Sequence, residues 1–242
     1  MPEVKVPLTT SVPGVGAKAL IGVAAVAAIA FVALAAFPYR ALLGSEEAAR
    51  QTLQEFQLIY WDRRGWLLAH IAAGIVALLS GPIQLWLGLH NVKMNVHRKL
   101  GALYMACVAI GSIAAIALAL QTDFGLIFGS GLFFLALAWI STTSFAFVAI
   151  RRSLVDQHRE WMIRSYVVTF AFVTFRIGQI ALVGAGVPIL TAIGVMAWAS
   201  WAVPLLVTEL VIQARNFRKH TPAAIGEHKT GQIAKAASNR GT

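Results

Sequence analysis

The chain has 242 residues, of which 58% are hydrophobic and 12% charged, and its mean hydropathy is +0.72. Soluble domains carry about 25% charged residues, so this composition excludes a water-soluble monomer, a disordered protein and a nucleic-acid-binding module. In so apolar a chain, the net charge of +10 suits loops beside an anionic membrane surface. The single cysteine, Cys107, excludes a disulfide framework and a cysteine-ligated metal or iron–sulfur site.

Apolar runs near 20 residues predict six transmembrane helices, and hence an all-α, multi-pass membrane bundle. The runs cover residues 19–37, 66–89, 100–120, 126–150, 161–183 and 189–213. They give a transmembrane domain over 19–216 with a core at 64–183. A tail precedes it at 1–18, and a basic tail that we expect to be disordered follows at 217–242.

The distribution of Lys and Arg predicts which side of the membrane each loop faces. With both termini in the cytoplasm, fourteen of the 20 basic residues lie on the inner side, and four lie in outer loops. This bias follows the positive-inside rule. The first run could also be a signal peptide, but 18 residues precede it and its apolar stretch is long for that purpose. We therefore expect a retained helix.

A weak repeat relates two hairpins of the chain. His97-Arg98 and His158-Arg159 each open a helix after a basic turn, and they lie 61 residues apart. Two readings stay open, a duplicated four-helix core or independent convergence on a basic inner turn.

Polar residues form a stripe along the second predicted span. At 100° per residue, the six positions fall within about 80° of one another: His70, Gly74, Ala77, Gly81, Gln84 and Gly88. The glycines allow close approach of a neighbouring helix or a flat ligand. Pro82 cannot donate a hydrogen bond to the carbonyl of Leu78, so we expect a kink and a free acceptor there.

The fifth predicted span carries a second stripe, provided that its helix extends back to His158. His158, Ser165, Thr169, Arg176 and Gln179 again fall within about 80°. Arg176 lies too deep to reach the surface easily, and its depth matches that of His70. We expect these two to share an outer polar site.

A second cluster is expected near the cytoplasmic ends of the helices. It contains His97, His158 and Arg164, together with Glu209, the only carboxylate within a predicted span. Glu209 is expected to neutralise Arg164 or a protonated His158. The cluster is either a functional site or a structural ion pair with interfacial histidines.

Several of these residues resemble a known family when they are taken as a set. They are His70, Gly81-Pro82-Ile83-Gln84, residues 97–104 (HRKLGALY), Trp139, residues 158–164 (HREWMIR) and Arg176. Together they resemble the bacterial predicted membrane proteins called domain of unknown function 2306, over about residues 64–180. The resemblance implies a bacterial inner-membrane protein and supplies no substrate. A looser similarity to cytochrome b561 and ferric-reductase bundles implies a b-type haem.

Three functions are compatible with these residues. A redox protein would hold haem b on His97 and His158, or on His70, or would bind a quinone at His70 and Arg176. A transporter or binding protein would take a small anion or a lipid headgroup. A structural partner of a membrane complex is the third. The expected partners are membrane lipids and a quinone or a membrane redox partner, with no nucleic acid; motifs of hydrolases and kinases are missing from the sequence.

Overall fold

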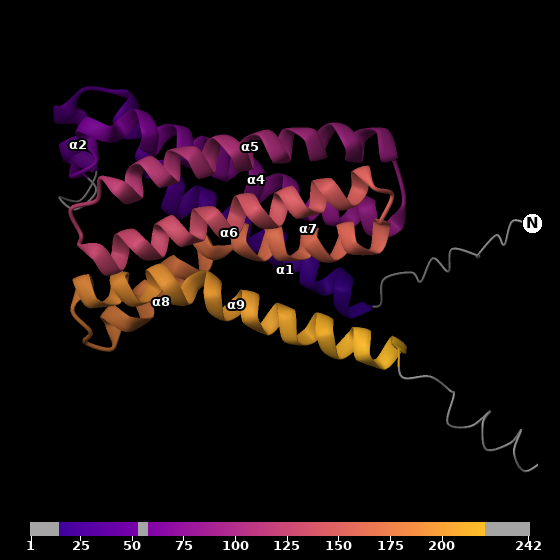
Figure 1. Cartoon of the computed structure of the whole chain (residues 1–242). Coiled ribbons are helices and arrows are strands. Elements are labelled where there is room, and N and C mark those ends of the chain that lie inside the picture. The colour runs from indigo at the N-terminus through magenta and orange to yellow at the C-terminus, as the bar shows by residue number, and fades with distance from the viewer. Residues whose placement is uncertain (1–14, 53–57, 221–242) are drawn as a thin grey trace, which may run out of the picture.

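The computed structural model describes residues 15–52 and 58–220, and it is built from helices (Figure 1). Five helical segments are long and apolar enough to cross a membrane, in agreement with the predicted multi-pass bundle. A further apolar helix, α1 (Val15–Phe31), is shorter, and it corresponds to the first of the six predicted spans. It continues into a π-helical turn, η1 (Val32–Ala36), and a 3-10 helix, η2 (Phe37–Leu43).

The segment between η2 and α4 folds into short helices. They are α2 (Glu46–Thr52) and η3 (Trp61–Arg63). Ala49 of α2 is buried against η2, together with Leu42.

The next three helices follow the predicted spans closely. They are α4 (Arg64–His90), α5 (Met94–Leu120) and α6 (Leu126–Arg151). The predicted start of α5 was residue 100, whereas the helix begins at Met94. Residues 94–99, which include His97, Arg98 and Lys99, therefore extend the helix beyond its apolar run, and hydropathy alone does not reveal this extension.

The fifth predicted span is broken in the middle. α7 (Val155–Thr169) ends where the hydroxyl of Thr169 donates to the carbonyl of Ser165, and α8 (Ala171–Gly184) begins after Phe170. The last helix, α9 (Ile189–His220), runs beyond the predicted end of its span at residue 213.

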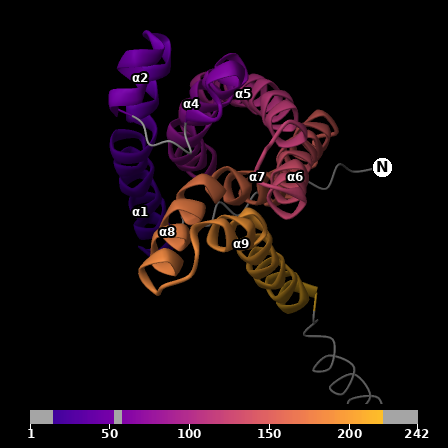
Figure 2. The same cartoon turned by 90° about the vertical axis from the view of Figure 1, so that its left-hand side faces the viewer.

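Seen along its axis, the bundle has a ring of α4, α5, α6 and α7 (Figure 2). α9 packs against α6, α7 and α8, and α1 packs against α4 and α8. The main core lies inside the ring around Tyr104, Trp139 and Val168. Large apolar side chains such as Leu126, Ile180 and Leu206 are exposed on the outside, as expected of a lipid-facing surface.

The chain turns divide between the two ends of the bundle. The start of α1, the α4–α5 and α6–α7 turns and the end of α9 lie toward one end, at the right of Figure 1. The α5–α6 and α8–α9 turns and α2 lie toward the other.

Candidate functional site: an apolar cavity with one uncompensated arginine

A cavity of about 220 Å³ lies inside the bundle, and its lining is almost wholly apolar. The aromatic side chains around it come from four helical segments, α1, η2, α6 and α8, and from the residue before η3: Phe31, Tyr39, Tyr60, Phe128, Trp139, Phe172 and Phe175. Its polar lining comes chiefly from His70, Arg176 and Ser200 and the two tyrosines. His70 and Arg176 thus lie at one cavity, as the sequence predicted.

His70 presents one ring nitrogen as a hydrogen-bond acceptor. Its Nδ1 lies 2.9 Å from the carbonyl oxygen of Gly111. A carbonyl only accepts, so Nδ1 carries the hydrogen, and Nε2 of the neutral ring keeps its lone pair. The ring is held edge-on by Phe172, with 5.0 Å between ring centres. His70 can therefore accept a hydrogen bond from a ligand hydroxyl.

Arg176 is bonded only to neutral groups. Its Nη1 donates to Oε1 of Gln179 at 3.0 Å, and its Nη2 donates to the hydroxyl of Tyr39 at 2.9 Å. Over residues 15–52 and 58–220, no carboxylate lies within 4.0 Å of this guanidinium. A charge inside a membrane span is costly unless it is paired, so this arginine favours a ligand that brings negative charge or strong acceptors.

Tyr60 contributes a neutral phenol to the lining of the cavity. Burial raises the pKa of its hydroxyl above the ordinary value, and this effect exceeds the lowering by a hydrogen bond with Thr122. Because its ordinary pKa is already near 10, the group stays protonated at neutral pH.

Both proline-containing spans have a freed carbonyl, and a hydroxyl from the broken span binds each one. Pro82 of α4 frees the carbonyl of Leu78, and the hydroxyl of Tyr166 donates to it at 3.1 Å. Pro204 of α9 frees the carbonyl of Ser200, to which Thr174 donates at 2.6 Å. The free acceptor predicted at Leu78 is confirmed, and its partner is now identified.

A buried chain of hydroxyl groups joins α5, α6 and α7. Oη of Tyr104 lies 2.7 Å from Oγ1 of Thr169 and 2.8 Å from Oγ of Ser165. Oγ1 of Thr143 lies 2.7 Å from Oγ of Ser165. The indole nitrogen of Trp139, which lines the cavity, donates to Thr169 at 2.8 Å.

The predicted stripe along the fifth span divides into two hydrogen-bonded groups. Ser165 and Thr169 lie in the hydroxyl chain, whereas Arg176 and Gln179 bond to each other and to Tyr39. Phe170, between α7 and α8, separates the two groups along the chain.

His97 and His158 do not line the cavity. His158 bonds through Nδ1 to the carbonyl of Ala146 at 2.9 Å, and it interacts electrostatically with His97. Gln84 donates to the carbonyl of His97 at 2.9 Å, and its Oε1 is buried without a partner in the described part of the chain. The structure therefore brings His97, His158 and Gln84 together, and a haem held by the histidines stays a prediction.

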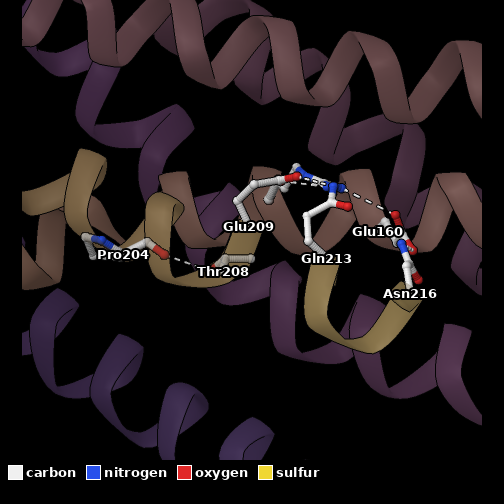
Figure 3. Close-up of polar contacts among 7 residues, drawn as sticks. Glu160, Pro204, Thr208, Glu209, Gln213 and Asn216 are labelled. Atoms are coloured by element: carbon white, nitrogen blue, oxygen red, sulfur yellow. Dashed lines mark hydrogen bonds and ion pairs between the residues drawn. The ribbon is translucent and has the colours of Figure 1, made fainter. Parts of the chain in front are cut away.

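Arg164 forms the ion pair that the sequence predicted with Glu209. Its Nε and Nη2 donate to Oε2 of Glu209 at 2.8 and 2.7 Å, and its side chain is 8% exposed. Figure 3 shows the polar residues of α9 around this pair, with Glu160 of α7 bonded to Asn216 at 3.1 Å. The charge of Arg164 is therefore paired with a carboxylate, whereas the charge of Arg176 has no carboxylate partner in the described part of the chain. The ion pair of Arg164 with Glu209 links α7 to α9.

Several cavity residues were not found from the sequence. Tyr39 and Tyr60 lie outside the apolar runs, and Ser200 is one small residue among many in α9. Their positions depend on how α1 and α9 pack against the ring. The polar residues His70 and Arg176 inside apolar spans were the signals that pointed toward this cavity.

Residues 67–212 match the family model described as "Predicted membrane protein (DUF2306)". The match covers more than half of the chain, so the chain belongs to this family, and it extends the expected resemblance into α9. No curated protein and no solved structure matches the chain.

Proposed function

We propose that this member of the DUF2306 family binds an amphiphilic molecule in the outer cavity. The apolar body of the ligand fills the aromatic lining, and its oxygen-bearing head group bonds to Arg176 and His70. The observation that carries the proposal is the guanidinium of Arg176, which lines an apolar cavity with only neutral partners. Ligand sites of this kind combine an apolar wall with a few polar groups that fix orientation.

The two polar groups specify the chemistry of the head group. Arg176 donates to an oxygen that is negatively charged or a strong acceptor. Nε2 of His70 accepts, so the head group also carries an O–H. A quinol and an anionic lipid with a hydroxylated head group both meet these requirements. The first would make the protein a redox protein, and the second a lipid-binding or lipid-transporting protein.

Binding by the purified protein in a mild detergent tests the proposal. A short-chain benzoquinone, its reduced quinol and short-chain phosphatidylglycerol are titrated separately by calorimetry. We expect saturable binding of the quinol or of the lipid, and the one that binds identifies the source of the head group. Arg176→Gln should weaken it about 10- to 100-fold, because a hydrogen bond to a charged group contributes about 1.5–3 kcal/mol.

Arg40→Gln is the matched control for that experiment. Arg40 belongs to η2 near the same end of the bundle, but its guanidinium lies over the ring of Phe37 and does not line the cavity. Its replacement should leave the affinity unchanged. Absence of saturable binding by all three probes, or equal affinities of wild type and Arg176→Gln, would reject the proposal.

We also propose that the chain crosses the bacterial inner membrane six times, with both termini in the cytoplasm. α1 spans about 26 Å at 1.5 Å per residue, a little less than the hydrocarbon core of about 30 Å, and η1 continues it directly. The turns after α4 and α6 carry Lys93, Arg151 and Arg152, whereas the turn after α5 carries Asp123. These charges support placing the former turns in the cytoplasm.

A further inference from the structure

The volume of the cavity restricts the kind of ligand that it holds. The cavity measures about 220 Å³. For comparison, a buried apolar cavity of about 150 Å³ binds one molecule of benzene. The present cavity therefore has room for a single six-membered ring with small substituents. A phospholipid brings a glycerol phosphate and two acyl chains, which need far more space, so the volume favours a quinol ring over a phospholipid.

The walls of the cavity also suit an aromatic ligand. Phe172 lies edge-on to the ring of His70, and the rings of Trp139 and Phe172 lie edge-to-face with 6.0 Å between their centres. Aromatic pairs favour this arrangement or an offset stack. Because the lining contains few polar side chains, the many oxygens of a phosphoglycerol group would lose the hydrogen bonds that they make in water. A quinol has only two oxygens on its ring.

Two nitrogen atoms of the lining are available to such a ring. Nε2 of His70 and Nε of Arg176 have no hydrogen-bond partner among the described residues, and both remain accessible. By contrast, Oγ of Ser200 also lacks a partner in that part of the chain, but this atom is itself buried. The cavity therefore offers a ligand one acceptor, on His70, and one charged donor, on Arg176.

A quinol and the corresponding quinone differ in the group that they present to His70. Both have an oxygen that accepts from Arg176, but only the quinol has an O–H that donates to Nε2. The carbonyl of Gly111 keeps the hydrogen of His70 on Nδ1, so the neutral ring has no donor to offer a quinone. Leaving a buried acceptor without its donor lowers affinity about 10- to 100-fold.

We propose, on the basis of the binding function proposed for this cavity, that it selects a quinone in its reduced form, as a quinol. One O–H of the ring donates to Nε2 of His70, and Nε of Arg176 donates to an oxygen of the same ring. Tyr39 accepts from Arg176 and keeps its own hydroxyl hydrogen, so it is a further donor. The hydrophobic substituent of the ring leaves between α1 and α4, where Phe31 and Ile71 line the cavity and are only partly buried.

This selection changes the redox behaviour of the bound molecule. If the quinol binds about 10- to 100-fold more tightly than the quinone, the reduction potential of the bound pair rises by about 30–60 mV, because a tenfold ratio corresponds to about 30 mV for a two-electron couple. The cavity therefore keeps a quinone in the state that has already taken up two electrons and two protons.

Paired titrations of the full-length protein in detergent test the selection. They are made at about pH 8, where an ordinary imidazole is neutral. The probes are a short-chain benzoquinone, its quinol, and the dimethyl ether of that quinol, which keeps both oxygens but has no O–H. We expect the quinol to bind about 10- to 100-fold more tightly than the other two. His70→Asn should abolish this preference, because the asparagine amide replaces Nδ1–H toward Gly111 and removes Nε2.

His90→Asn is the matched control. His90 belongs to the same helix and also bonds through Nδ1 to a backbone carbonyl, that of Trp86 at 2.9 Å, but it does not line the cavity. This variant should keep the preference of the wild type. Thermal unfolding shows which variants are folded, and His70→Phe, which keeps an aromatic ring without Nε2, replaces His70→Asn if that variant is not.

The possible results separate this selection from the proposed function itself. Saturable binding of short-chain phosphatidylglycerol without binding of the quinol would overturn the selection and leave the proposed function standing. Equal affinities of quinol and quinone for the wild type, or a preference that survives in a folded variant without Nε2, would overturn the selection as well. Absence of binding by every probe would reject both.

Discussion

Gly81 is the glycine of α4 that a neighbouring side chain approaches most closely. A Cβ atom built there would lie 1.9 Å from Cε2 of Tyr166 and 2.2 Å from its Cδ2. The ring of Tyr166 is buried and its hydroxyl is bonded to the carbonyl of Leu78, so it has little freedom to move away. Glycine is required here because the aromatic ring occupies the place of a side chain.

Gly81→Ala should therefore destabilise the protein by about 1–3 kcal/mol, the usual cost of overpacking a core. Thermal unfolding in detergent measures the effect. Gly74→Ala is the control on the same stripe of α4, because the nearest atom to its added Cβ would be 3.9 Å away, on Phe172. Equal melting temperatures for the two variants would contradict this account of Gly81.

Some residues of the site were recognised from the sequence, and others were not. The glycine stripe, His70 and Arg176 were recognised because polar or minimal side chains are conspicuous in an apolar run. Thr143 and Tyr104 were not recognised as partners of Ser165, because threonine and tyrosine occur in spans without any polar partner. Their hydrogen bonds exist only once α5, α6 and α7 are packed together.

At the scale of whole elements, α7 and α8 supply hydroxyls that satisfy the carbonyls freed in two other helices. Tyr166 binds the carbonyl freed by Pro82, and Thr174 binds the one freed by Pro204. In a membrane, an unpaired carbonyl costs more than it does in water. The carbonyl that each proline frees therefore needs a hydrogen-bond donor from another helix, which can follow or precede the proline's own helix in the chain.

A double-mutant cycle measures this dependence. Tyr166→Phe should cost about 1 kcal/mol in the wild type, a typical value for one hydrogen bond. It should cost less in a Pro82→Ala background, where the new amide donates to the carbonyl of Leu78 within α4. Pro204→Ala, in α9, is the control background, and there the two changes should add. An unchanged cost of Tyr166→Phe beside Pro82→Ala would show that the two groups are not coupled.

The sequence predicted most of the helices, but it did not predict where a helix is interrupted. Apolar runs predicted α4, α6 and the start of α9 to within two residues. The break at Phe170 lies in an apolar run with no proline or glycine beside it, so no local signal marked it. It coincides with the bond from the Thr169 hydroxyl to the backbone carbonyl of Ser165, four residues earlier in the same helix, a contact that apolar periodicity does not encode.

For the molecule as a whole, the charges at the two ends of the bundle predict its orientation. A variant with Cys107→Ala lacks cysteine, because Cys107 is the single one in the chain. In that background, Gln121→Cys in the α5–α6 turn should react with a membrane-impermeant maleimide on intact cells. Arg152→Cys in the α6–α7 turn should react only after lysis. The reverse pattern would place the termini outside.

The proline pairings also have a consequence for synthesis of the chain. Tyr166 follows Leu78 by 88 residues, so α4 emerges long before the group that completes its hydrogen bonding. At about 5–20 residues per second, roughly 4–18 s separate the two. The carbonyl of Ser200 is different, since its partner Thr174 has already been made when α9 emerges. During insertion, the carbonyl of Leu78 in α4 therefore lacks this hydrogen-bond donor until Tyr166 has been made. If the ribosome stalls before Tyr166, that carbonyl stays exposed to lipid or to the insertion machinery.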